Sequence, residues 1–119
     1  MAEGTYSIKS VDGRTHIWRQ TRLIELAKSL PVKMVLIKSI REFDQTMWFY
    51  GPRNVQPTCR EVALHARRIF QASLEYPIIL SASGRLMDGM HRVAKAYIKG
   101  MTEIKAVQFA SDPDPDEIV

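Results

Sequence analysis

The chain has 119 residues, of which 45% are hydrophobic and 25% are charged, an ordinary balance for one soluble domain with a modest core. No apolar run approaches the ~18–20 residues of a membrane-spanning helix, and the first residues lack the basic and apolar regions of a signal peptide. A single cysteine, Cys59, excludes an internal disulfide and a zinc site built from several cysteines. We therefore expect a cytoplasmic protein with no membrane partner.

The formal net charge is +4, and it is unevenly distributed along the chain. Residues 111–119 contain four acids and no base, so the rest of the chain has a formal net charge of +8. Such a body attracts phosphate groups, either of free nucleotides or of nucleic acid, although a basic surface can also serve solubility alone. Acids alternate with prolines in residues 111–119, which predicts an extended, mobile acidic tail.

The first part of the chain predicts a hairpin followed by a helix. Two segments of alternating β-forming residues, 5–10 and 14–19, flank Asp12-Gly13, a dipeptide typical of hairpin turns. Apolar residues then recur on one face of a predicted helix over residues 21–30, which Pro31 ends. We interpret residues 1–30 as an N-terminal addition to a core of residues 31–110.

The next segments predict one strand and one irregular region. Residues 32–40 are rich in β-branched and aliphatic side chains, which indicates a strand. Residues 41–56 have no clear period and contain an aromatic cluster at 47–50. A loop of this length is often a functional lid. We favour the other interpretation, a hydrophobic plug that includes Trp48 and covers the core.

The second half predicts two helices and three strands. Thr58 and Glu61 form a capping box at the start of the first helix. The strands are expected at 78–80, 85–87 and 103–109, and the second helix at 90–99. The residues predicted to face the core from the two helices are Val62, Ala66, Ile69 and Phe70, and Met90, Val93, Ala94 and Tyr97. His16 and His65 are expected to be surface residues, because neither has a plausible ligand neighbour in the sequence.

The most distinctive motif is Asp88-Gly89-Met90-His91-Arg92, between a predicted strand and a predicted helix. The start of a helix leaves backbone N–H groups unpaired and has the positive end of the dipole, and a glycine lets a ligand approach closely. His91 and Arg92 add donors in the first turn, so the motif suits a phosphate. Asp88 is predicted to be the N-cap residue; the alternative is that it binds a metal or a hydroxyl beside the phosphate.

This box, the strands around it and the small residues Ala94 and Ala96 resemble the ParB/sulfiredoxin-like superfamily, over roughly residues 57–109 and more faintly over 32–43. The resemblance implies a single α+β domain over residues 1–119, with a small mixed sheet and packed helices. In relatives the matching His-Arg or Arg-Arg pair grips nucleotide phosphates together with the amides of the turn. The phosphate-binding positions that the resemblance implies are therefore Gly89, Met90, His91 and Arg92.

Two further arginines become candidates through the same resemblance. Relatives often have a hydroxyl residue that meets a phosphate on the helix before the strand at 78–80, and Arg68 occupies that position. A guanidinium there could bind a phosphate through two hydrogen bonds, or it could be an ordinary surface arginine. Arg41 falls near an arginine that follows the first strand in relatives.

Departures from the superfamily pattern narrow the expected activity. Sulfiredoxins have a catalytic cysteine where this chain has Met90, and a thioether cannot attack a phosphorylated sulfinic acid, so the protein is not expected to be a sulfiredoxin. ParB clamp proteins have two arginines in the box and a helix-turn-helix domain after it, and this chain has neither. ParB-like free serine kinases have a closely similar box, which suggests a small nucleotide-dependent kinase. Its catalytic carboxylate is not identified; the candidates are Asp88, Glu42 and Asp44.

The favoured function is the binding of a nucleotide or a phosphorylated small molecule at Gly89–Arg92, with phosphotransfer as a further step. The expected ligands are ATP, ADP or CTP with Mg²⁺, and no metal site built from protein residues is expected. One alternative is a nucleic-acid-associated ParB-like module, a nuclease or partition accessory, with weak, non-specific DNA binding through backbone phosphates. Another alternative is an interaction domain without a ligand.

Overall fold

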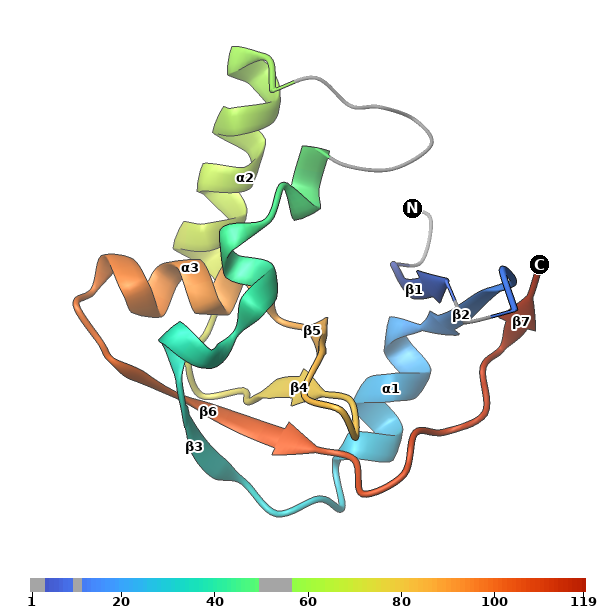
Figure 1. Ribbon diagram of the computed structural model, residues 1–119. Coiled ribbons are helices and arrows are strands. Elements are labelled where there is room, and N and C mark those ends of the chain that lie inside the picture. The colour runs from blue at the N-terminus through green and yellow to red at the C-terminus, as the bar shows by residue number, and fades with distance from the viewer. Residues whose placement is uncertain (1–3, 10–11, 50–56) are drawn as a thin grey trace.

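The computed structural model describes residues 4–9, 12–49 and 57–119, which form three α-helices and two small sheets (Figure 1). In chain order the elements are β1 (Thr5–Lys9), β2 (Thr15–Arg19), α1 (Gln20–Ala27), β3 (Lys33–Leu36), the 3₁₀ turns η1 (Ile37–Ser39), η2 (Arg41–Asp44) and η3 (Met47–Phe49), α2 (Cys59–Gln71), β4 (Ile78–Leu80), β5 (Leu86–Asp88), α3 (Met90–Ile98), β6 (Glu103–Gln108) and β7 (Glu117–Ile118). The predicted α+β class is confirmed. In the described part of the chain, no helix is both long enough and apolar enough to cross a membrane.

The larger sheet has the strand order β3-β6-β4-β5 and hydrophobic clusters on both faces. β6 pairs antiparallel with β3 and parallel with β4, and β5 pairs antiparallel with β4. Successive side chains of a strand point to opposite faces. Ile78 therefore packs in one cluster with Val93 of α3, while Ile79 packs in the other with Leu23 of α1.

The N-terminal hairpin and α1 supply much of the second cluster. β1 and β2 pair antiparallel around Asp12-Gly13, so the predicted hairpin is confirmed. Gly13 has a φ of 83°, a left-handed conformation that suits glycine in such a turn. Trp18 of β2 and Leu23 of α1 are buried in this cluster. Residues 1–30 were interpreted as an addition to the core, but the described part of this segment contributes buried side chains to the second cluster.

The strand predicted over residues 32–40 is shorter in the structure. β3 ends at Leu36, whose carbonyl oxygen accepts a hydrogen bond of 2.6 Å from Oγ of Ser39, and 3₁₀ turns replace the rest. Phe43 and Trp48 pack against the cluster that contains Val93, as the plug interpretation predicts. Residues 50–56, the remainder of the predicted irregular region, lie outside the described residues.

α2 begins as predicted but buries a different face. Oγ1 of Thr58 accepts a hydrogen bond of 3.2 Å from the backbone N–H of Glu61, which confirms half of the capping box. The predicted core face is wrong: Val62 is 51% exposed and Phe70 is 84% exposed. The residue of α2 that is buried is His65. In Figure 1 α2 extends away from the sheet, with the end of the helix beside α3.

Two residues of α3 also differ from the predicted helix face. Tyr97, predicted to be buried, is 62% exposed, and Ala96 is buried instead. Nζ of Lys95 donates to the backbone carbonyls of Phe70 and Ala72, at 2.9 and 2.6 Å. A cation at the end of α2 satisfies carbonyl groups that have no partner within the helix. Lys95 therefore fixes the end of α2 to α3.

The tail at residues 111–119, predicted to be extended and mobile, contacts the rest of the domain at several points. β7 pairs antiparallel with β2, next to the hairpin (Figure 1). Nε1 of Trp18 donates to the carbonyl oxygen of Pro113 at 2.8 Å. Asp116 accepts from the backbone N–H of Arg19 at 2.8 Å, and Asp112 accepts from that of Ala82 at the same distance. Two tail carboxylates thus have specific partners.

Candidate functional site

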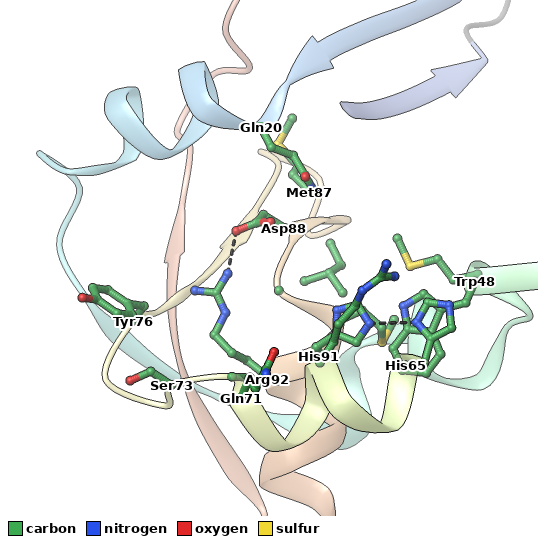
Figure 2. A pocket seen from close by; sticks show the side chains of 16 residues that line it. Gln20, Trp48, His65, Gln71, Ser73, Tyr76, Met87, Asp88, His91 and Arg92 are labelled. Atoms are coloured by element: carbon green, nitrogen blue, oxygen red, sulfur yellow. Dashed lines mark hydrogen bonds and ion pairs between the residues drawn. The ribbon is translucent and has the colours of Figure 1, made fainter. Parts of the chain in front are cut away.

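A cavity of about 660 Å³ lies where the first turn of α3 faces α2 and the turn η3 (Figure 2). Its wall combines segments that are far apart in the sequence, from α1 to α3. The lining residues with polar side-chain atoms are Gln20, Trp48, His65, Arg68, Gln71, Ser73, Tyr76, Asp88, His91 and Arg92. Four positions of the phosphate-binding prediction, Gly89 to Arg92, line this cavity together with Arg68.

The start of α3 has no side-chain cap. Gly89, not Asp88, occupies the N-cap position, so the predicted capping role of Asp88 is wrong. Gly89 has a φ of 115°, and a Cβ atom on it would lie 2.6 Å from Cγ2 of Ile78. Only glycine fits this conformation and this close approach to β4 without strain. The fold therefore requires a glycine at position 89 whether or not a ligand binds there.

Asp88 instead forms an ion pair with Arg92. Nη2 of Arg92 lies 2.6 Å from Oδ2 of Asp88, and the two side chains are only 17% and 14% exposed. Nη1 of Arg92 also donates to the carbonyl oxygen of Pro77 at 3.2 Å. These bonds fix the first turn of α3 to the ends of β4 and β5. They also leave fewer of the donors of Arg92 for a ligand than the sequence suggested.

Met90 and His91 contribute to the site in different ways. The Met90 side chain packs in the hydrophobic cluster with Val93, so Met90 offers a ligand mainly its backbone. Nε2 of His91 lies 2.9 Å from Nδ1 of His65, within hydrogen-bond distance (Figure 2). Both imidazole rings stack on Trp48, with centroid distances of 4.4 Å for His65 and 4.7 Å for His91.

The structure overturns the prediction that His65 is a surface residue. Its side chain is 8% exposed and lines the cavity. Its two ring partners lie 17 and 26 positions away in the sequence, so no local pattern could identify the contact. An isolated histidine in an amphipathic helix carries no signal that distinguishes a surface residue from a buried one.

Burial and neighbouring charges keep both imidazoles in the neutral form at neutral pH. The pKa of His91 is lowered to about 4, mainly by burial and then by His65, Arg68 and Arg92 in that order. The pKa of His65 is also lowered, mainly by burial and then by Arg68. The backbone carbonyl of Arg68 accepts from Ala72, but its guanidinium makes no hydrogen bond or ion pair with another described residue, and it lines the cavity. It is thus a positive charge that a ligand can reach.

Three predicted candidates lie elsewhere. Arg41, Glu42 and Asp44 belong to η2 and do not line the cavity. Oε1 of Glu42 is buried without a hydrogen-bond partner among the described residues. Over residues 4–9, 12–49 and 57–119, no group of three or more histidine, cysteine, aspartate or glutamate side chains is arranged to hold a metal ion.

Fold and site together define a small α+β domain with a polar cavity at the start of a helix. Comparison with known proteins adds no relative, since no family model, no curated protein and no solved structure matches the chain.

Proposed function

We propose that the protein is a ParB/sulfiredoxin-like domain that binds a nucleotide or another phosphorylated ligand in the cavity at the start of α3. The observation that carries this proposal is the convergence of Arg68, Arg92 and the uncapped helix start at Gly89 on one cavity. A helix start favours an anion through its unpaired N–H groups and its dipole. Arg68 adds a guanidinium that can bind two phosphate oxygens at once.

The remaining polar groups suit the rest of a nucleotide. The carboxylate of Asp88 keeps one oxygen beyond its bond to Arg92 and can accept a hydrogen bond from a ligand hydroxyl, such as that of a ribose. Mg²⁺ would arrive with the nucleotide, bound mainly by phosphate oxygens and water, as is usual for this ion. ATP, ADP and CTP are therefore the ligands to examine first.

A substitution of Arg68 tests the proposal more cleanly than one of Arg92. Arg68→Gln should weaken binding of ATP, ADP or CTP about tenfold or more, because a hydrogen bond to a charged group contributes roughly 1.5–3 kcal/mol. Arg67→Gln is the matched control, since Arg67 is the neighbouring exposed arginine of α2 and does not line the cavity. Affinities would be measured by calorimetry and by thermal shift, with and without Mg²⁺.

Two results would contradict the proposal. One is that none of the nucleotides stabilises the unchanged protein. The other is that the Arg68→Gln and Arg67→Gln variants bind the nucleotides with equal affinity. Arg92→Ala is less informative, because it leaves the carboxylate of Asp88 without its ion-pair partner and lowers the stability of the unliganded fold.

A further inference from the structure

The two imidazoles in the cavity wall form a hydrogen-bonded pair. Nδ1 of His65 faces Nε2 of His91 at 2.9 Å, and the planes of the two rings are 18° apart. Trp48 stacks on both rings, with interplanar angles of 15° and 13°. Three nearly parallel rings restrict one another's rotation. The facing nitrogens are consequently held in one arrangement.

This arrangement constrains where protons lie. A neutral imidazole has one N–H donor and one bare nitrogen that accepts. When both rings are neutral, a single proton lies between the two facing nitrogens. If it belongs to His91, then Nδ1 of His91 and Nδ1 of His65 are the accepting atoms and Nε2 of His65 is the remaining donor. The pair thus presents one acceptor and one donor at its two outer nitrogens.

We propose that His65 and His91 form a proton-transfer pair for phosphoryl transfer, an inference that rests on the proposed binding of a phosphorylated ligand in this cavity. His91 is the catalytic residue that contacts the attacking hydroxyl group, and His65 is the positioning residue that accepts the displaced proton. His91 belongs to the first turn of α3, where the phosphate would bind. His65 and Arg68 are three residues apart in α2, close to one helical turn, and both line the cavity.

The chemical step balances with a hydroxyl compound, or water, as the phosphoryl acceptor. The hydroxyl oxygen forms a bond to the terminal phosphorus, and the bond from that phosphorus to the bridging oxygen breaks. The bridging oxygen keeps the electron pair and leaves as phosphate of the shortened nucleotide. The hydroxyl proton moves to Nδ1 of His91, the Nε2 proton of His91 moves to Nδ1 of His65, and the Nε2 proton of His65 passes to the leaving phosphate or to water.

The pair ends this step neutral, with each ring in its other tautomer. No imidazolium has to form, which fits a site where burial and the nearby arginines disfavour a second positive charge. Arg68 remains available to stabilise the charge that develops on the transferring phosphoryl group. The ring pair therefore supplies acid–base function at a place where a charged histidine is unfavourable.

The variant His65→Asn should remove proton transfer but keep the orientation of the His91 ring. The asparagine side-chain oxygen can accept the hydrogen bond of His91, but it cannot pass a proton on. We would follow hydrolysis of ATP, ADP and CTP by ³¹P NMR, with and without Mg²⁺, for the unchanged protein, His65→Asn and the control His16→Asn on β2. General acid–base catalysis contributes roughly 10²–10⁴-fold, so kcat should fall at least about 100-fold in His65→Asn. The nucleotide affinity should change less than threefold, and the His16→Asn variant should keep its kcat.

A measurement without a ligand accompanies these assays. The ¹⁵N shifts of the imidazoles should show both rings neutral at pH 7, with one shared proton between Nδ1 of His65 and Nε2 of His91. The inference is overturned if the unchanged protein binds nucleotides but hydrolyses none, if His65→Asn keeps the full kcat, or if the rings titrate independently. Failure to bind any nucleotide would overturn the proposed function, and this inference with it.

Discussion

A neutral imidazole lies beside the guanidinium groups at the start of α3, and this has consequences for stability as well as for binding. His91 contacts His65 of α2 at 2.9 Å, while Arg68 and Arg92 are close enough to act on its charge. Protonation of His91 is unfavourable because the ring is partly buried and because positive charges lie close to it. The unliganded fold is therefore disfavoured whenever this ring is protonated.

Acid should destabilise the protein through His91. The pKa of this ring is about 4 in the folded chain and ordinarily about 6.5, so below pH 6.5 the unfolded chain binds a proton that the folded chain does not. The free energy of unfolding should thus fall as the pH drops from 6.5 to 4, by about 1–2 kcal/mol once solvent screening of a partly exposed ring is allowed for.

Urea unfolding at pH 7 and at pH 4.5 would measure this effect. His91→Gln should reduce the difference in unfolding free energy between the two pH values, because a side chain that does not titrate replaces the ring. His16→Gln, on β2 and outside the cavity, should keep the difference seen in the unchanged protein. An equal pH dependence in all three proteins would contradict the assignment of the effect to His91.

At the scale of elements, the junction between β5 and α3 requires its glycine. Gly89→Ala should destabilise the fold, because the added Cβ would lie 2.6 Å from Ile78 and because the φ of 115° is unfavourable for alanine. Gly100→Ala is the matched control: its φ of 79° is also left-handed, but a Cβ there would have no atom within 4 Å. The two variants therefore share backbone strain and differ in the steric contact.

The measured quantity is the difference in unfolding free energy between these two alanine variants. Gly89→Ala should be less stable than Gly100→Ala by about 1–3 kcal/mol, the usual range for an overpacked core position. Equal stability of the two variants would contradict the close contact between Gly89 and Ile78 of β4 that the structure shows.

Among these elements, the features that depend on neighbouring residues could be predicted from the sequence, whereas the buried face of α2 could not. The Asp12-Gly13 hairpin and the helix cap at Thr58 depend on residues a few positions apart, so both were predictable. The period of α2 correctly marked an apolar face containing Phe70, but a period cannot tell which side of a helix the fold buries. That side holds His65, because its partners come from η3 and α3.

In the candidate site, too, the contiguous residues could be identified from the sequence, whereas contacts between distant residues could not. The motif from Asp88 to Arg92 was visible because its residues are contiguous. Gly89 rather than Asp88 occupies the N-cap position, and Asp88 pairs instead with Arg92, whose guanidinium also binds the carbonyl of Pro77 just before β4. The contact between His65 and His91 spans 26 positions and follows only from the packing of α2 against α3.

At the scale of the whole molecule, the tail joins the two sheets. Asp112 binds the backbone of Ala82, which precedes β5 of the larger sheet, while β7 extends the smaller one. Between these points Trp18 donates to Pro113 at 2.8 Å. Two acids of this tail, Asp112 and Asp116, therefore serve structure: Asp116 is bound to the backbone of Arg19 and lies 3.4 Å from Nη1 of Arg22.

Removal of residues 111–119 should accordingly destabilise the domain. The deletion takes away β7 and leaves Nε1 of Trp18, which is buried, without its acceptor. A hydrogen bond contributes about 0.5–1.5 kcal/mol, and several are lost, so the free energy of unfolding should fall by roughly 2–4 kcal/mol. Chemical denaturation followed by the fluorescence of Trp18 and Trp48 would measure the loss.

A single substitution controls for the change in net charge that the deletion causes. Glu117→Gln removes a tail charge at an exposed position of β7 and should leave the stability within about 0.5 kcal/mol of the unchanged protein, as surface substitutions usually do. Asp116→Asn should have an intermediate effect, because hydrogen bonding to the backbone of Arg19 lowers the pKa of this carboxyl and stabilises its charged form. A truncated chain as stable as the full one would show that the tail makes no net contribution, and that the smaller sheet holds together through β1 and β2 alone.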